Sequence, residues 1–354
     1  MNKIWERNHG YTILRPYVDA CTRMSYRKFR IEGTLPDSGA VLIAPNHTNT
    51  LMDALVVLRS RHRATVFGAR ADIFEQKTVA AILRFLRILP MVRRRDGIRN
   101  VLRNYEVFAE VDDVLANNVP FCMFAEGRHR PMHSLLPIGK GIARIAFASA
   151  AERPTVIIPT GIDYTDFFHY RGNVVLRFGE PMDVNAFLAA HEADGEAARY
   201  QAFRDELFSR ISGVITYVPD DENYEARWAE IEAERRKGRL PKWLRMVLAV
   251  LTAPFFALAA LLTLPMWGIG EYLCHFMVKD AAFRNTVRFG CKLLLTPIMI
   301  IVWGLVFGLC LPGAALALGL TGWLASGWTL AALGILLFLP SYSIFYDWLN
   351  LVRE

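Results

Sequence analysis

Apolar and polar positions follow two different periods before residue 242. Short apolar runs that end in polar residues predict strands at 39–47, 64–69, 119–127, 155–164 and 173–182. Apolar residues at helical spacing predict helices at 52–61, 79–89, 100–118 and 141–152. Because strands that alternate with helices pair mostly in parallel, we expect an α/β fold, a mostly parallel sheet flanked by helices.

The pattern changes after residue 242, where long apolar runs begin. One run covers 246–268, and residues 293–340 contain no charged residue. A membrane-spanning helix needs about 20 apolar residues, so the first run can span once and the second twice. The second run has a natural break at Leu311-Pro312-Gly313. We therefore expect a C-terminal region of transmembrane or re-entrant helices at 244–354.

Basic residues flank the first apolar run on both sides, at 235–245 and at 279–292. Positive charge favours the cytoplasmic side, so both flanks are expected on the same side. Either the run is a re-entrant hairpin bent near Pro254 or Pro265, or it spans against the charge rule; the hairpin fits the charges better. The second run would return the C-terminus to the cytoplasm. The expected location is integral in the inner or plasma membrane, with the α/β domain on the cytoplasmic face.

Residues 186–240 read as helical and become strongly charged towards their end. We interpret 216–243 as a charged helical linker, which is the usual meaning of such a charge run. The α/β domain is then expected at 31–215. Residues 1–30 are expected to form an amphipathic segment whose aromatic side chains hold it at the bilayer surface.

Net charge and cysteine content indicate which binding partners and which cellular compartment to expect. The formal net charge of +7 comes without a nucleic-acid-binding motif, so an anionic lipid surface, or plain solubilising charge, explains it better than nucleic acid. The five cysteines form no C-x-x-C pair, which argues against a zinc site or a disulfide framework and favours a reducing compartment. The N-terminus lacks the apolar core of a secretion signal, so we do not expect secretion.

Candidate chemistry begins in the stretch NHTNTLMD, at the end of the first strong strand. A neutral imidazole at His47 can take a proton from an alcohol, and Asp53 can orient it. Six positions apart on a straight helix the two side chains would face different ways, because each residue turns about 100°. Contact therefore requires a non-helical turn over 48–50, which Thr and Asn favour. The alternative is a strand-end histidine and an aspartate on a helix surface.

Two further segments carry basic residues. Arg93 and Arg95 share one face of an extended segment and can grip a phosphate, although a solvated turn or a lipid-headgroup contact explains them equally well. Glu126 and Gly127 follow a predicted strand. Three basic positions come after them: Arg128, Arg130 and, just before a helix whose N-terminus favours anions, Lys140. The spacing around Lys140 is not that of a nucleotide-binding loop.

Together and in this order, these segments resemble the glycerolipid acyltransferase family, which acylates glycerol-3-phosphate or 1-acylglycerol-3-phosphate. The resemblance covers roughly residues 30–184. The chain departs from the family in having five residues rather than four between His and Asp, as in a subgroup similar to fungal-type glycerol-3-phosphate acyltransferases. It also has Ala125 in place of proline, and His129 where many members carry arginine. The matching positions are Asn46, His47 and Asp53, then Arg93, then Glu126 and Gly127, then Pro159.

The resemblance implies an O-acyltransferase. His47 would deprotonate a glycerol hydroxyl with Asp53 orienting it, and the alkoxide would attack the thioester of acyl-CoA or acyl carrier protein. The resemblance implies no metal and no cofactor besides this donor. The phosphate-binding group would be Arg93, Arg95, Glu126, Gly127, Arg128 and Arg130, supported by Asn46, Lys140 and Pro159.

Two other readings stay open: an acyltransferase for another lysolipid, and a non-catalytic membrane lipid-binding protein of the same fold. A serine hydrolase is excluded because the chain has no G-x-S-x-G elbow.

Overall fold

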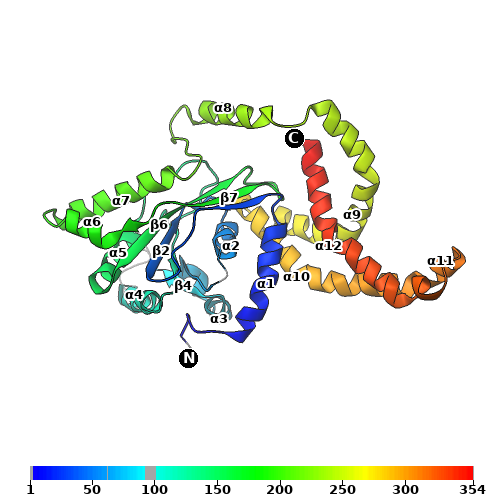
Figure 1. Cartoon of the computed structure of the whole chain (residues 1–354), viewed down its shortest axis with the longest axis horizontal. Helices are drawn as coiled ribbons and strands as arrows, with labels where there is room; N and C mark the ends of the chain where they lie inside the picture. Colours follow the sequence, from blue (N-terminus) through cyan, green and yellow to red (C-terminus); the bar gives the residue numbers. More distant parts are fainter. Residues whose placement is uncertain (1–2, 62, 92–100, 354) are drawn as a thin grey trace. The chain divides into compact units, whose positions relative to one another are not determined.

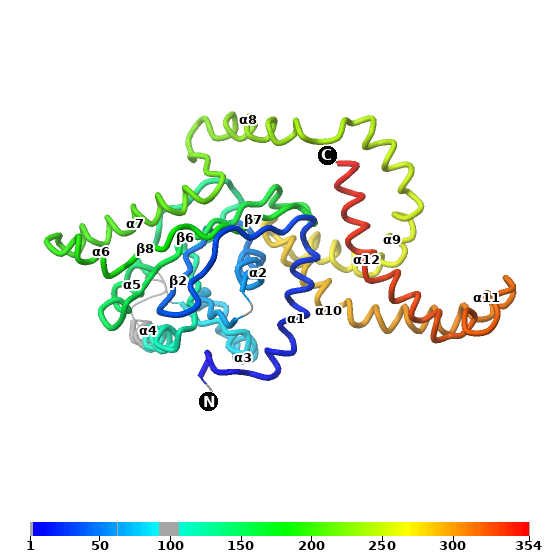
Figure 2. The backbone as a smooth tube through the Cα atoms, viewed as in Figure 1, coloured from blue at the N-terminus to red at the C-terminus, as the bar shows by residue number. Residues whose placement is uncertain are grey.

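The computed structural model describes residues 3–61, 63–91 and 101–353, apart from the side chains of 101–105. The chain divides into two compact units. Unit 1 comprises 1–19, 29–165 and 174–228, and unit 2 comprises 20–28, 166–173 and 229–354. Each is treated separately below, and Figures 1 and 2 trace the backbone through both.

Unit 1 is built on one mixed sheet of eight strands in the described part of the chain. The strand order is β1-β7-β6-β2-β5-β3-β4, with β8 beside β6. Only the β6–β7 and β6–β8 pairs of these strands are antiparallel, so the predicted mostly parallel sheet is confirmed. The strands are β1 (Phe29–Glu32), β2 (Ala40–Pro45), β3 (Val66–Arg70), β4 (Ile88–Met91), β5 (Phe121–Cys122), β6 (Thr155–Tyr164), β7 (Val174–Phe178) and β8 (Met182–Asp183).

Strand β2 lies at the centre because every one of its residues is apolar and buried. Ala40, Leu42 and Ala44 point into a core that helices from the second half of the unit complete. Residues on a strand alternate between faces, so Val41 and Ile43 point to the opposite face, which α2 covers (Figure 1). The helices of this unit are α2 (Leu51–Arg59), η1 (Ala71–Phe74), α3 (Lys77–Phe85), α4 (Val101–Ala116), α5 (Lys140–Glu152), α6 (Val184–Ala190) and α7 (Glu196–Ser212).

One predicted helix boundary is wrong. The helix expected over 79–89 ends at Phe85, and Ile88 already begins strand β4. Arg87 separates the two, with a left-handed φ of +62°. Its buried guanidinium donates to the carbonyls of Trp5 and Glu6 and lies 4.8 Å from the ring of Tyr11. Long-range contacts of Arg87 therefore end the helix, and an apolar run cannot reveal them.

Helix α1 (His9–Met24) occupies most of the predicted N-terminal amphipathic segment. Its Arg15 is buried and donates to the carbonyls of Leu58 and Arg61 at the end of α2. Ile13, two residues earlier and therefore on a different face of the helix, is 79% exposed. Part of the polar face of α1 is thus used inside unit 1, and the membrane-associating role of the segment stays a prediction.

Helix α8 (Tyr224–Lys237) begins inside unit 1, although it belongs to the segment predicted as a linker. The Tyr224 hydroxyl accepts a hydrogen bond from the backbone N–H of His133 at 3.0 Å. The Trp228 ring stacks on the ring of His133 with 3.8 Å between centroids. The first turns of α8 are therefore anchored to the loop that follows Glu126.

Unit 2 contains three helices that are long and apolar enough to cross a membrane, among the described residues. They are α9 (Lys242–Phe276), the segment Ala281–Cys310 made by η4 (Ala281–Phe283), α10 (Arg284–Leu305) and η5 (Val306–Cys310), and α12 (Gly327–Arg353). Helix α11 (Pro312–Ala317) and η6 (Gly322–Ala325) join the last two, so the predicted break at 311–313 is confirmed and the turn is longer than expected.

The first apolar run forms one continuous helix with no turn at Pro254 or Pro265, and its re-entrant or spanning course stays a prediction. Both prolines lie inside α9, which curves along its length (Figure 1). Near its start, Arg245 donates to the carbonyl of Leu351 on α12. Near its end, Glu271 pairs with Arg288 on α10 at 2.9 Å. Both ends of α9 therefore contact the same end of the α10–α12 hairpin.

Candidate active site

The site is built on the turn between β2 and α2, at the carboxyl end of the central strand. In parallel α/β sheets this edge is where functional loops gather. Asn46 is buried and fixes the start of the turn: its Nδ2 donates to the carbonyl of Ile162 at 3.1 Å, and its Oδ1 accepts from the N–H of Ile162 at 2.7 Å. The start of the turn after β2 is thus fixed to the neighbouring strand β6.

His47 and Asp53 meet across this turn. Nδ1 of His47 lies 2.8 Å from Oδ2 of Asp53, whose side chain is fully buried, whereas the imidazole is 17% exposed. The same Oδ2 accepts the backbone N–H groups of Thr48 and Asn49, each at 2.7 Å. An ionised carboxylate only accepts hydrogen bonds, so Nδ1 of His47 is the donor, and in a neutral imidazole Nε2 then carries the lone pair. This is the geometry of an oriented general base.

The backbone of Thr50 makes the turn that brings His47 and Asp53 together despite the five residues between them. It has φ +48° and ψ −124°, and the carbonyl of Asn49 accepts from the N–H of Met52 at 3.0 Å. These angles are those of the first central residue of a type II′ turn, a position that favours glycine. A β-branched residue is strained there, at a cost on the order of 1–3 kcal/mol. The non-helical turn that the sequence required is therefore present, and it stores strain.

Glu126 holds the backbone of the turn from the opposite side. Its Oε1 accepts the N–H of His47 at 2.7 Å, and its Oε2 accepts the N–H of Leu136 at 2.8 Å. Burial raises the pKa of Glu126 to about 7, while the two N–H donors and His47 act in the opposite direction. The carbonyl of His47 accepts the N–H of Arg130 at 3.0 Å. Both backbone polar groups of His47 are thus fixed by the 126–130 loop.

Two aromatic rings confine the imidazole of His47. Phe124 stacks on it with 4.1 Å between centroids and 20° between planes. His129 approaches edge-on at 5.8 Å. Stacking on one side and an imidazole edge on the other limit the rotation of the ring, which keeps the Asp53 contact in place.

Comparison with known proteins identifies a family for the segment that contains these residues. Residues 27–163 match the family described as Acyltransferase. This segment is an acyltransferase-family domain. It contains Asn46, His47, Asp53, Glu126 and Pro159, so each of these predicted site positions lies inside the matched segment.

Curated relatives match the same domain over part of their length. The chain is 30% identical over 146 residues to glycerol-3-phosphate O-acyltransferase 2 of Saccharomyces cerevisiae, which is 39% of this chain and 19% of that protein. It is 30% identical over 122 residues to glycerol-3-phosphate O-acyltransferase 1 of the same yeast, 34% of this chain and 16% of that protein. The match therefore spans less than a fifth of either relative.

A solved structure is also similar. The 1-acyl-sn-glycerophosphate (LPA) acyltransferase PlsC of Thermotoga maritima aligns with a TM-score of 0.41 and 18% identity. The alignment covers 60% of this chain and 84% of that one.

The basic residues that the sequence predicts near the candidate site differ in their surroundings. The Arg130 guanidinium is engaged by Asp220 and by the Ser134 hydroxyl. Arg128 is exposed beside Gly127, whose φ of +69° favours glycine. Lys140 is exposed at the first position of α5. Arg93 and Arg95 lie outside the described residues.

The remaining predicted position, Pro159, lies buried inside β6, where its carbonyl accepts the N–H of Gly179 at 2.8 Å. It supports the sheet beside β2 and does not reach the His47–Asp53 pair. Among the described residues, no three His, Cys, Asp or Glu side chains gather as a metal ion would require.

Sequence reasoning missed three contributors to this site. Tyr164 donates its hydroxyl to Oδ1 of Asp53 at 2.7 Å, Phe124 stacks on His47, and the N–H groups of the turn bind Oδ2. Phe124 lies in the predicted strand 119–127 and begins the segment FAEG that resembles the family, but no contact with His47 was predicted for it. Tyr164 closes the apolar strand VIIPTGIDY, where an aromatic residue is ordinary.

Proposed function

We propose that this protein transfers a fatty acyl group from acyl-CoA or acyl carrier protein to a hydroxyl of glycerol-3-phosphate or 1-acylglycerol-3-phosphate. The observation that carries the proposal is the 2.8 Å contact between His47 Nδ1 and the buried Asp53 carboxylate, within an acyltransferase-family domain. The names of the two yeast relatives, both glycerol-3-phosphate O-acyltransferases, support glycerol-3-phosphate as an acceptor.

The proposed reaction is a direct transfer. Nε2 of His47 takes the proton of the acceptor hydroxyl while the oxygen bonds to the thioester carbonyl carbon. Asp53 stabilises the imidazolium that forms. The C–S bond then breaks, and the imidazolium returns the proton to the leaving thiolate. The balance of atoms requires no covalent acyl-enzyme.

The acceptor phosphate sets the geometry in this proposal. Arg93 and Arg95 remain its proposed ligands, and exposed Arg128 joins them because its loop also carries Glu126. Holding the phosphate places the hydroxyl at the base, and such positioning accounts for much of the rate of bimolecular reactions. Arg130 joins this group if substrate displaces Asp220.

A membrane arrangement is part of the proposal. Helices α9, α10 and α12 would insert, and the acyltransferase domain would lie on the cytoplasmic face. The support is the basic residues on both flanks of α9, together with the contacts of both its ends with one end of the α10–α12 hairpin.

The acceptor assay tests the substrate class. The protein in detergent is offered labelled acyl-CoA or acyl carrier protein with glycerol-3-phosphate, 1-acylglycerol-3-phosphate or a zwitterionic lysolipid. Arg93→Ala is assayed beside a matched control, Arg63→Ala, an exposed arginine of unit 1. We expect a higher KM for the phosphate acceptor in Arg93→Ala alone. Preference for the zwitterionic lysolipid, or no effect of Arg93→Ala, would overturn the phosphate-acceptor assignment.

A further inference from the structure

Three consecutive residues at the end of β6 link the candidate active site to the rest of unit 1. Ile162, Asp163 and Tyr164 are all buried, with exposed fractions of 1%, 7% and 1%. Alternation along the strand places the side chains of Ile162 and Tyr164 on one face and that of Asp163 on the other. Each residue makes a different connection, and together they fix where the strand ends.

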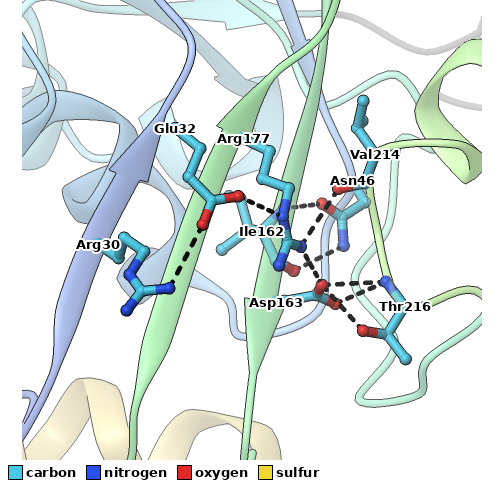
Figure 3. A network of polar contacts seen from close by, with 8 residues as sticks. All are labelled: Arg30, Glu32, Asn46, Ile162, Asp163, Arg177, Val214 and Thr216. Atoms are coloured by element: carbon cyan, nitrogen blue, oxygen red, sulfur yellow. Dashed lines mark hydrogen bonds and ion pairs between the residues drawn. The ribbon is translucent and has the colours of Figure 1, made fainter.

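The first two connections are visible in Figure 3. The backbone of Ile162 is bonded in both directions to the side chain of Asn46, immediately before His47. Asp163 accepts from the N–H and hydroxyl of Thr216, each at 3.0 Å, and pairs with Arg177. Arg177 in turn pairs with Glu32 at 2.8 Å. The end of β6 is thus held to β7, β1 and the segment after α7.

The third connection reaches the candidate base through Asp53. The Tyr164 hydroxyl donates to Oδ1 of Asp53 at 2.7 Å. The other oxygen, Oδ2, serves His47 Nδ1 and the N–H groups of Thr48 and Asn49. Oδ2 of Asp53 therefore binds the turn and the imidazole, and Oδ1 accepts the hydrogen bond of Tyr164.

We propose that Tyr164 is a positioning residue: its hydroxyl sets the plane of the Asp53 carboxylate and thereby the orientation of His47. The proposal rests on the proposed role of His47 as general base. Without the hydroxyl, Oδ1 of Asp53 stays buried and loses the donor seen in the structure. The carboxylate is then held through Oδ2 alone, so its plane is no longer fixed and the direction in which Oδ2 meets the imidazole can change. Tyr164 is 1% exposed, so its effect on the reaction passes through Asp53.

The test is Tyr164→Phe in the full chain, which removes one oxygen and keeps the ring in the core. Its matched control is Tyr170→Phe, another buried tyrosine, whose hydroxyl contacts Ser25 in unit 2. Acyl transfer and the melting temperature are measured for both. We expect kcat to fall about 10-fold in Tyr164→Phe with the acceptor KM unchanged, because one hydrogen bond to a charged group is lost. Tyr170→Phe should keep its kcat even if it melts earlier.

A double substitution separates positioning from general weakening. Asp53→Asn alone and with Tyr164→Phe should have the same kcat, because Tyr164 acts only through Asp53. Additive losses, or a kcat of Tyr164→Phe equal to that of the unmodified protein, would overturn the proposal.

A second readout does not depend on turnover. In protein labelled with ¹⁵N-histidine, the Nδ1 resonance of His47, assigned by its absence in His47→Ala, should shift in Tyr164→Phe and stay in place in Tyr170→Phe. An unshifted resonance in Tyr164→Phe contradicts the positioning role. If His47→Ala retains full activity while the resonance shifts, the proposed base is wrong and the contact through Asp53 still holds.

Discussion

The buried carboxylate of Glu126 should make the stability of the protein depend on pH, and one substitution can isolate this effect. Its side chain is 9% exposed, and burial raises its pKa from 4.5 to about 7. A carboxyl group whose pKa is raised in the folded state binds its proton more tightly there than in the unfolded chain. Its contribution to stability is therefore complete below pH 4.5 and is lost as the pH rises through 7.

Glu126→Gln keeps the size of the side chain and removes this titration. One pKa unit corresponds to about 1.4 kcal/mol. Between pH 5 and 8 the free energy of unfolding of the unmodified protein should therefore fall by about 2 to 3 kcal/mol more than that of the variant. In melting temperature this difference is roughly 5–10 °C. The variant should therefore gain stability relative to the unmodified protein as the pH rises.

The assay is thermal unfolding in detergent at pH 5, 6, 7 and 8. Glu180→Gln, at an exposed glutamate of the same unit, is the control and should follow the unmodified protein at every pH. Parallel curves for Glu126→Gln and the unmodified protein would refute the reasoning, because Glu126 would then titrate as it does in the unfolded chain.

Three further substitutions probe the site. Asp53→Asn should lower kcat by about 10³- to 10⁴-fold, because an amide cannot hold the Nδ1–H tautomer of His47; a kcat within tenfold of the original would contradict this orienting role. Gly127→Ala should lower stability by roughly 1–2 kcal/mol because of its positive φ, with no collision of the added methyl group; an unchanged melting temperature would argue against that backbone conformation. Asp220→Asn removes the ion pair of Arg130 and leaves its Ser134 contact, and it should lower the KM of a phosphate acceptor about two- to fivefold; an unchanged KM removes Arg130 from the phosphate ligands.

The sequence predicts much of the sheet because burial on both faces leaves a strong signal. The run VLIAP in β2 is apolar along its whole length, the run TVIIPTGIDY in β6 is mostly apolar and almost entirely buried, and both strands form where expected. Weak signals were missed: β1 is four residues long, with a mostly exposed pattern, and β8 has two residues. The end of α3 was misplaced because the contacts of Arg87 involve residues about 80 positions earlier.

The candidate site was predictable in part for the same reason. The sequence places His47 and Asp53 on a short turn, and the residue types between them allow it to bend. The position of the backbone strain depends on how the N–H groups of Thr48 and Asn49 and the hydroxyl of Tyr164 bind Asp53, and Thr50 carries that strain. Tyr164 lies 111 positions from Asp53, so their contact depends on how β6 pairs with β2 and has no local pattern.

The central claim is that His47 removes the proton from the acceptor hydroxyl. The most direct measurement is the single-turnover rate of acyl transfer from labelled acyl-CoA or acyl carrier protein to glycerol-3-phosphate and 1-acylglycerol-3-phosphate, with His47→Ala beside the unmodified chain. His191→Ala is the matched control, since His191 also pairs with an aspartate through Nδ1, at 2.7 Å, outside the site. We expect His47→Ala to lose at least about 100-fold in rate and His191→Ala to lose none. Equal rates for His47→Ala and the unmodified chain would contradict the mechanism.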